Sequence, residues 1–254
     1  MSSKRYKNKA CPYCGQQGVS STADHVLCRK FFVVEDRANL PIVPACEPCN
    51  NAKSELELYA CTVMPFAATH PAASEVLTND VVGRLMNNQK LRRILSASFE
   101  YKYFYSAEHG WQIGAALDYD NEKITNLFTY IVKGLAFHYW GLVFDDEHTV
   151  GAAHFAQGGE QIFERMLQSQ GVADRQTGNW GNGVFKFEGV RAAGHPTFTV
   201  WRMNLLGAEV SGGQRAKGAR LTNVYGFTVP RGMPVNLPAV DAPNAVDRCA
   251  ELGT

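Results

Sequence analysis

The sequence predicts an α+β protein with a zinc-bearing N-terminal segment, and three observations lead to this prediction. Two Cys-x-x-Cys pairs lie within the first 50 residues. Apolar side chains over residues 121–139 recur at the 3, 4 spacing of one helix face, which predicts a long helix. Three late segments, residues 183–190, 197–205 and 221–229, alternate and are rich in Phe, Val and Thr, as is typical of antiparallel strands joined by Gly-rich turns.

The composition of the 254-residue chain excludes several classes of protein. With 45% hydrophobic residues it is too apolar for a disordered chain. The 25 Lys and Arg residues against 24 Asp and Glu residues exclude a uniformly basic coat, so any anion-binding surface must be local. No run approaches the roughly 18 apolar residues of a membrane span, and the basic N-terminus lacks the apolar core of a signal peptide. We therefore expect a cytoplasmic protein.

Two domains are expected, residues 1–64 and residues 65–254. The first combines a flexible basic arm with most of the cysteines, and the second begins with a stretch that is rich in proline and small residues. The second domain is predicted to be a mixed helix and antiparallel-sheet domain for substrate selection, regulation or oligomerisation. Its further predicted elements are a helix over 75–97, strands over 101–105 and 111–117, and a short helix over 159–169.

The spacing of the cysteines predicts a structural zinc site. Two thiolates two residues apart on a tight turn can both reach one ion, and this chain has two such pairs separated by 31 residues. The four predicted ligands are Cys11, Cys14, Cys46 and Cys49. The other cysteines, Cys28, Cys61 and Cys249, have no partner spacing and are interpreted as buried or incidental thiols. An odd number of cysteines without an export signal fits a reducing compartment.

Residues suited to phosphodiester hydrolysis accompany the cysteine pairs. Asp24 and His25 are adjacent, and Asn50 directly follows the second pair. Hydrolysis needs a water nucleophile, a base for its proton and a cation for the developing charge. A hard cation such as Mg²⁺ or Mn²⁺ prefers oxygen ligands, which Asp24 and an Asn carbonyl can supply, so His25 is left as the base. Neighbours in a strand point to opposite faces, so Asp24 and His25 flank one site only if the chain bends or the histidine reaches across.

This stretch resembles the HNH endonuclease family, in the zinc-braced, Asn-ending variant typified by endonuclease VII. The resemblance covers about residues 10–60 and is carried by Cys11-Pro-Tyr-Cys14, Asp24-His25-Val26, Asn39-Leu40, Cys46-Glu-Pro-Cys49-Asn50 and Lys53. It implies a β-hairpin followed by a helix around one metal ion, the ββα-metal fold. It also implies that His25 is the general base, that Asp24 and Asn50 bind the catalytic ion, and that Asn39 ties down the loop that positions His25. The four cysteines would hold structural zinc.

The resemblance also suggests partners. It favours DNA over RNA as the substrate, and a role in phage or mobile-element conflict fits the family. The size of the second domain is compatible with a homodimer or a regulatory protein partner. Two departures from the family pattern concern Cys28, which stands where many members carry proline, and the loop over residues 29–37, which lacks the usual Gly-rich turn.

Two segments concentrate positive charge and are candidates for nucleic-acid binding. Residues 84–102 hold five basic side chains against one acidic, and residues 211–222 hold three basic side chains and no acid. The candidate contacts are Lys53, Arg92, Arg93, Arg215, Lys217 and Arg220. Scattered solvated charge is the alternative interpretation. The aromatic residues over 101–105 could stack on bases, although aromatic residues in strands more often belong to the core.

The main alternative function is a non-catalytic zinc module that binds nucleic acid or protein. It would need the four cysteines but not Asp24, His25 and Asn50. A third interpretation is a nuclease that the second domain holds inactive until a ligand or partner binds. His138 lies on the apolar face of its predicted helix and is expected to be a core residue, and the Gly-rich segment over 178–183 is expected to be a turn.

Overall fold

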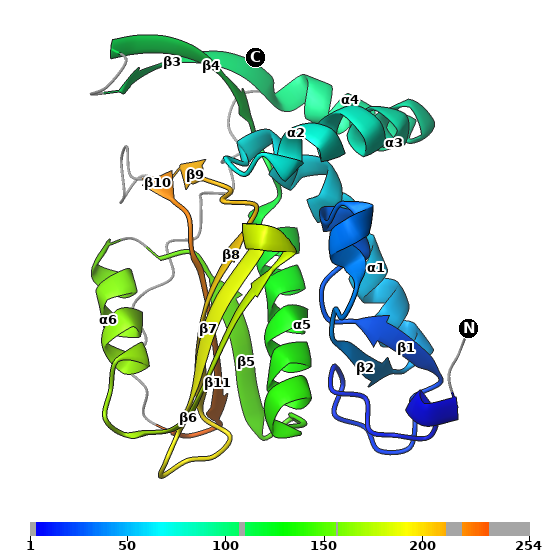
Figure 1. Cartoon of the computed structure of the whole chain (residues 1–254), viewed down its shortest axis with the longest axis vertical. Coiled ribbons are helices and arrows are strands. Elements are labelled where there is room, and N and C mark those ends of the chain that lie inside the picture. Colours follow the sequence, from blue (N-terminus) through cyan, green and yellow to red (C-terminus); the bar gives the residue numbers. More distant parts are fainter. Residues whose placement is uncertain (1–3, 107–109, 156, 212–219, 234–254) are drawn as a thin grey trace, which may run out of the picture.

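The computed structural model describes residues 4–106, 110–155, 157–211 and 220–233, and a five-stranded antiparallel sheet dominates the part it describes (Figure 1). In spatial order its strands are β5 (His148–Ala153), β11 (Val224–Pro230), β8 (Thr199–Leu205), β7 (Phe185–Ala192) and β6 (Val172–Trp180). The long helix α5 (Asn121–Trp140) covers one face of this sheet, and the shorter α6 (Gln157–Leu167) covers the other. The expected α+β class is confirmed.

The alternating side chains of the sheet form two hydrophobic cores. Trp201 of β8 packs toward α5, where its ring lies 4.9 Å from the ring of Trp140. The neighbouring Val200 points to the other face and joins the core beneath α6, where the rings of Phe163 and Tyr225 are 5.2 Å apart. Because both faces are covered by helices, apolar side chains on either side of a strand are buried.

The strongest periodic segments of the sequence form the elements predicted for them. Helix α5 begins at the N-cap residue Asp120, whose side chain accepts a hydrogen bond from the Lys123 N–H (3.2 Å), and ends at Gly141 in the left-handed conformation. The three late alternating segments form β7, β8 and β11. Strands β5 and β6 were not predicted, because β5 consists largely of small residues and β6 is an edge strand with a mostly polar sequence.

The prediction of one helix over residues 75–97 is wrong. The segment forms α2 (Ala72–Val76), a π-helical turn (Leu77–Val81), α3 (Val82–Asn87) and α4 (Gln89–Ser98). The break lies at Asn88, which leaves the helical region with φ −121° and ψ 84°. Its side chain accepts a hydrogen bond from the Leu91 N–H (3.0 Å), so Asn88 caps a new helix rather than continuing the old one.

A two-stranded hairpin follows α4 and lies apart from the large sheet in Figure 1. It consists of β3 (Phe99–Ser106) and β4 (Gly110–Leu117). Its aromatic side chains were expected to be core residues, but Tyr101, Tyr103 and Trp111 are 74%, 73% and 73% exposed. A second short pair joins β9 (Val210–Ser211) to β10 (Arg220–Leu221).

The N-terminal segment has the order strand, strand, helix. Strand β1 (Thr22–His25) pairs antiparallel with β2 (Ile42–Ala45), and α1 (Glu47–Val63) follows. Its hydrophobic core continues without a break into the core beneath α5. Gly134 of α5 allows this close approach, since an added Cβ would lie 2.9 Å from a methyl group of Val26. The predicted boundary at residue 64 therefore does not separate two hydrophobic cores.

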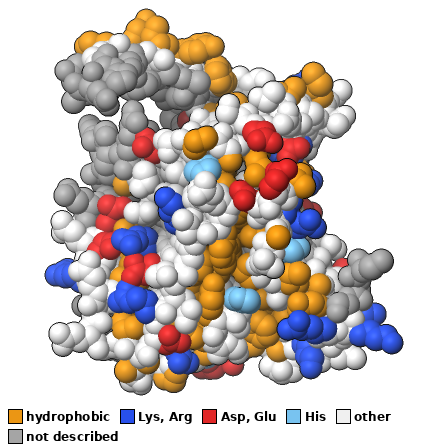
Figure 2. All heavy atoms as spheres, viewed as in Figure 1, with side chains coloured by type: hydrophobic (Ala, Val, Ile, Leu, Met, Phe, Trp, Pro, Cys, Tyr) orange, Lys and Arg blue, Asp and Glu red, His pale blue; other side chains and the backbone are white. Residues whose placement is uncertain are grey.

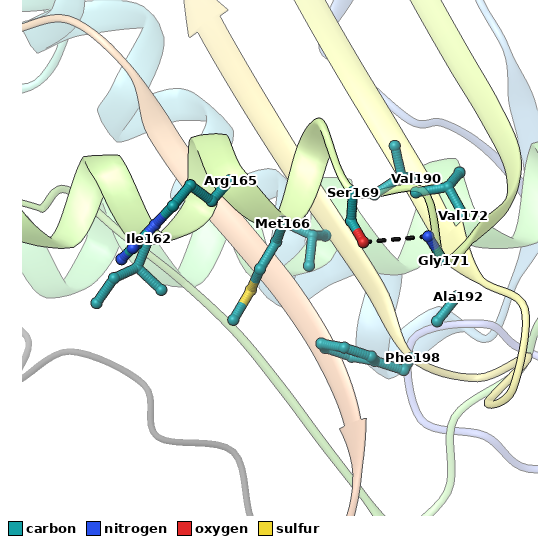
Figure 3. A pocket seen from close by; sticks show the side chains of 10 residues that line it. Ile162, Arg165, Met166, Ser169, Gly171, Val172, Val190, Ala192 and Phe198 are labelled. Atoms are coloured by element: carbon teal, nitrogen blue, oxygen red, sulfur yellow. Dashed lines mark hydrogen bonds between the residues drawn. The ribbon is translucent and has the colours of Figure 1, made fainter.

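A cavity of about 350 Å³ lies between α6 and the sheet (Figure 3). It is lined by Ile162, Arg165, Met166, Ser169, Gly171, Val172, Val190, Ala192, Phe198 and Val200. The Ser169 hydroxyl accepts a hydrogen bond from the Gly171 N–H (3.1 Å), so the chain itself uses this polar group. The cavity lies on the α6 side of the sheet, away from the cysteines.

Buried His154 makes stability depend on pH. Burial lowers its pKa to about 4, from an ordinary value of 6.5. Between these values the unfolded chain binds a proton that the folded chain does not, so stability falls as the pH falls. We expect this histidine to remove about 2 kcal/mol from the free energy of unfolding between pH 7.5 and 5. In urea titrations His154→Leu should lose less stability over this range than the wild type or than His195→Leu, an exposed control. Equal losses in all three would contradict the prediction.

Candidate functional site

The four cysteines of the two pairs form one cluster, as the sequence predicted. Their Sγ atoms all lie within 4.8 Å of one another, and the Cys14 and Cys46 Sγ atoms are 3.8 Å apart. A tetrahedral zinc site with Zn–S bonds of about 2.3 Å has S···S edges of about 3.8 Å. All four thiols are free of disulfide bonds. Both the donor atoms and their spacing therefore fit a structural Zn²⁺ ion.

Two local structures bring the thiols together. In the first pair, the Gly15 N–H donates to the Cys11 carbonyl (2.9 Å) and closes a tight turn. Gly15 is required there, because its φ is +79° and an added Cβ would lie 2.5 Å from the Phe144 carbonyl oxygen. In the second pair, Cys46 is the N-cap of α1 and Cys49 lies in its first turn. Both thiols lie at the positive end of the helix dipole, and the pKa of Cys46 is lowered, whereas burial raises the pKa of Cys49.

A buried ionic network lies beside the cluster and joins β1 to α1. The Lys53 side chain is 0% exposed, and its Nζ lies 3.0 Å from Asp24 Oδ2 and also contacts the Glu57 carboxylate. Nζ further donates to the backbone carbonyl of His25 (2.7 Å). Asp24 Oδ2 accepts a second hydrogen bond, from the Tyr13 hydroxyl (2.5 Å). Burial acts to lower the pKa of Lys53, but the carboxylates of Glu57 and Asp24 outweigh this and raise it.

The prediction that Lys53 contacts nucleic acid is wrong. A fully buried ammonium group cannot reach a phosphate, and all three of its contacts are inside the protein. Lys53 and Glu57 are four residues apart on α1, so they share a helix face, and this face meets β1. The i, i+4 spacing was visible in the sequence, but the burial was not.

Removing the buried charge should be costly. Lys53→Met keeps the length of the side chain but leaves two buried carboxylates without their cation, so we expect a loss of about 3–5 kcal/mol in the free energy of unfolding. Lys123→Met is the matched control, because the Lys123–Asp120 pair is exposed and should contribute at most about 1 kcal/mol. Urea unfolding of both variants measures the difference. Similar small losses in both would show that the buried network does not stabilise the fold.

His25 ends β1 and lies opposite Ile42 of β2. Its side chain is half-buried, and Nδ1 is a buried atom without a hydrogen-bond partner among the described residues. Burial lowers the pKa of His25, with the positive charge of Arg29 acting in the same direction. The ring is therefore held toward the neutral form, in which one nitrogen can accept a proton.

Asn39 shapes the loop that leads to His25. It is exposed and has φ +63°, a left-handed conformation that Asn adopts more readily than most residues. Two residues later the Pro41 carbonyl accepts a hydrogen bond from the Val26 N–H (2.9 Å), which extends the pairing of the two strands. The predicted role of Asn39 in tying down this loop stays a prediction.

Asn50 lies in the first turn of α1, and its backbone N–H donates to the Cys46 carbonyl (3.0 Å). It precedes Lys53 by three residues and so shares the face of α1 that meets Asp24. The structure thus places Asp24 against the helix turn that follows Asn50.

Asp24 pairs with Val43, and His25 pairs with Ile42, so these neighbours point to opposite faces of the hairpin.

The other predicted nucleic-acid contacts do not gather at this site. Arg92 and Arg93 are exposed on α4, which lies at the opposite end of the molecule from β1 and β2 in Figure 1. Arg215 and Lys217 lie outside the described residues. Arg220 is in β10, and nothing is described of its side chain.

One histidine is placed differently from the prediction. His138 was expected in the core, but it is exposed near the end of α5. It lies in the last turn of α5, and the buried positions of this helix end at Ala136. The sequence carried no signal for Tyr13 as a member of the buried network, and for Glu57 only its i, i+4 spacing from Lys53.

Comparison of the chain with protein-family models, with curated proteins and with solved structures found no match. Among the described residues, no helix combines the length and the apolar character that crossing a membrane requires.

Proposed function

We propose that this protein is a metal-dependent endonuclease of the HNH type that hydrolyses phosphodiester bonds, with DNA as its substrate. The observation that carries the proposal is the arrangement of β1, β2 and α1 around the four-cysteine cluster. The cluster ties the turn at Cys11 to the start of α1, and β1 ends with Asp24 paired to Lys53 of that helix and with His25 on the opposite face of the hairpin. This matches the order hairpin, then helix, that the family resemblance implies.

In this proposal His25 takes the proton of the attacking water. Nδ1 of its ring is buried and has no hydrogen-bond partner among the described residues, and we assign the proton transfer to Nε2. The lowered pKa of His25 keeps the ring neutral and able to accept a proton near neutral pH. The His25 backbone is fixed by its pairing with β2 and by the hydrogen bond from Lys53.

Asp24 and Asn50 supply the oxygen donors that suit a catalytic cation. A carboxylate and an amide carbonyl are hard ligands of the kind that Mg²⁺ and Mn²⁺ prefer. Tyr13 and Lys53 both engage Oδ2 of Asp24, so Oδ1 is the atom through which Asp24 would bind the ion. A divalent ion held there would offset the negative charge that develops on the phosphate during hydrolysis.

A specific observation supports a second candidate, a non-catalytic zinc-braced module that binds nucleic acid. The Lys53 ammonium lies 3.0 Å from Asp24 and already neutralises that carboxylate. A second cation beside it would meet charge repulsion in a buried setting. This candidate needs the cysteine cluster but no reactive imidazole.

An incision assay separates the two candidates. Supercoiled plasmid is incubated with the purified chain after a brief EDTA treatment, with and without restored Mg²⁺ or Mn²⁺, while zinc content is measured in parallel because chelation can also remove zinc. The nuclease predicts incision that depends on the restored ion and on His25. Binding of plasmid without incision, in a chain that retains its zinc, would favour the non-catalytic module.

A further inference from the structure

A groove of about 680 Å³ runs beside the β1–β2 hairpin. Residues from the N-terminal segment, the Asn39 loop, β2 and the end of α5 form it. Its lining is Arg5, Tyr6, Lys9, Ala10, Asn39, Leu40, Pro41, Ile42, Pro44, Phe137 and His138. The lining includes two cationic side chains and no acidic one. Its floor is largely apolar, with prolines, Ile42 and Phe137.

The basic segment beside the groove is held in place. The sequence suggested a flexible arm, but residues 4–9 are anchored through buried Ser20. The Ser20 hydroxyl accepts a hydrogen bond from the Lys9 N–H (2.7 Å) and donates to the Tyr6 carbonyl (2.7 Å), and the Ser20 carbonyl accepts from the Asn8 N–H (2.8 Å). The backbone that carries these cations is therefore positioned before any ligand arrives.

Positive charge gathers at this corner of the molecule. Lys4, Arg5, Lys7 and Lys9 are all exposed, and no acidic residue lies among them. Figure 2 shows Lys and Arg side chains grouped at the lower right, over the N-terminal segment and the hairpin. The chain as a whole has a formal charge of only +1, so this is a local concentration.

Strand pairing connects the groove to His25. Residues paired across two antiparallel strands point to the same face of the sheet. Ile42, which lines the groove, is paired with His25, and Pro44 lies on that same face two residues later. Asp24 points to the other face, toward Lys53. The groove therefore follows the face of the hairpin that carries the imidazole.

We infer that this groove binds the sugar–phosphate backbone of a nucleic-acid strand next to the bond that is cut, an inference that rests on the proposed nuclease function. Arg5 and Lys9 line it, and both are cations of the kind that contact backbone phosphates. The apolar floor suits the sugars and base edges of a nucleic-acid strand. A flat anionic membrane surface has no such groups to place in the groove. These two residues belong to the basic N-terminal arm and not to the segments over residues 84–102 and 211–222.

Binding of a fluorescent 20-base-pair DNA duplex by the full chain, without added Mg²⁺, tests the groove. Arg5→Gln/Lys9→Gln removes both cations, and Arg92→Gln/Arg93→Gln removes two exposed cations from α4 as the matched control. Each duplex phosphate contact contributes about 0.9 to the slope of log K against log salt. We expect the groove variant to lower the slope by about 1.8 and the affinity by roughly tenfold, and the control to change both little. Circular dichroism and zinc content verify that the variants are folded.

The outcomes separate this inference from the proposed function. DNA binding that depends on Arg5 and Lys9 without plasmid incision supports the groove and contradicts the nuclease. Incision together with unchanged binding by the groove variant overturns the groove alone, as does a loss of binding only in the α4 control. A wild-type chain that does not bind the duplex also overturns the groove. An equal loss of binding to phosphatidylserine vesicles or polyglutamate would show a general anion surface and overturn the nucleic-acid assignment.

Discussion

His25→Ala is expected to reduce metal-dependent incision of plasmid by at least about 100-fold. A positioned base typically contributes 10²- to 10⁴-fold to a hydrolytic rate, and alanine removes the ring that would accept the proton of water. The ion pair and hydrogen bonds of the buried network use the His25 backbone carbonyl rather than its ring, so they survive the substitution. Zinc content and thermal stability should stay close to those of the wild type.

His195→Ala is the matched control for this experiment. His195 is an exposed histidine in the turn before β8, far along the chain from the cysteine cluster. The same loss of a ring at this position should leave incision within about twofold of the wild type. Full activity of His25→Ala, with incision still dependent on the divalent ion, would remove His25 from the mechanism.

Cys49→Ser should have the largest effect on the fold. Serine is a poor zinc ligand, and structural Zn²⁺ in small zinc-binding peptides contributes about 10–16 kcal/mol of binding free energy near pH 7. Part of this energy holds the turn at Cys11 against the start of α1, so we expect near-complete loss of bound zinc and a loss of several kcal/mol of stability. Incision should disappear too, because Asn50 follows Cys49 in the same helical turn.

Cys28→Ser controls for the loss of a thiol outside the cluster. Cys28 is half-buried and is absent from the group of four sulfur atoms that lie together. It should therefore keep the zinc content of the wild type, measured by mass spectrometry, and melt within a few degrees of it. Wild-type zinc content in Cys49→Ser would show that the cluster does not hold the ion as a four-thiolate site.

The local patterns of this sequence were sufficient to predict several parts of the structure. The cysteine spacing predicted the cluster because a Cys-x-x-Cys turn is a local geometry that holds two thiols together, and the two turns meet. The 3, 4 periodicity predicted α5 because a buried helix face imposes it over many turns. The break at Asn88 was missed. An Asn within a helix-forming stretch becomes an N-cap only where its backbone leaves the helical conformation, and the sequence does not show where this happens.

The positions of individual polar side chains depended on packing instead. In the sequence, Lys53 has the features of a solvated helix lysine. In the structure α1 packs against β1, and this packing buries Lys53 between Asp24 and Glu57. His138 has the spacing of a core residue, yet it is exposed in the last turn of α5. Whether such a side chain is buried depends on which helices and strands pack against each other. A local sequence pattern does not contain this information.

The sequence alone predicted the α+β fold class, the four thiols that gather and the adjacent acid and histidine, because each of these follows from residue types at characteristic spacings. Only the tertiary structure decided that Asp24 is already paired with a buried lysine, that His25 faces the other side of the hairpin, and that a basic groove follows that side. The physical reason is that the environment of a charge is set by atoms brought from distant parts of the chain, which become its neighbours only when the chain folds.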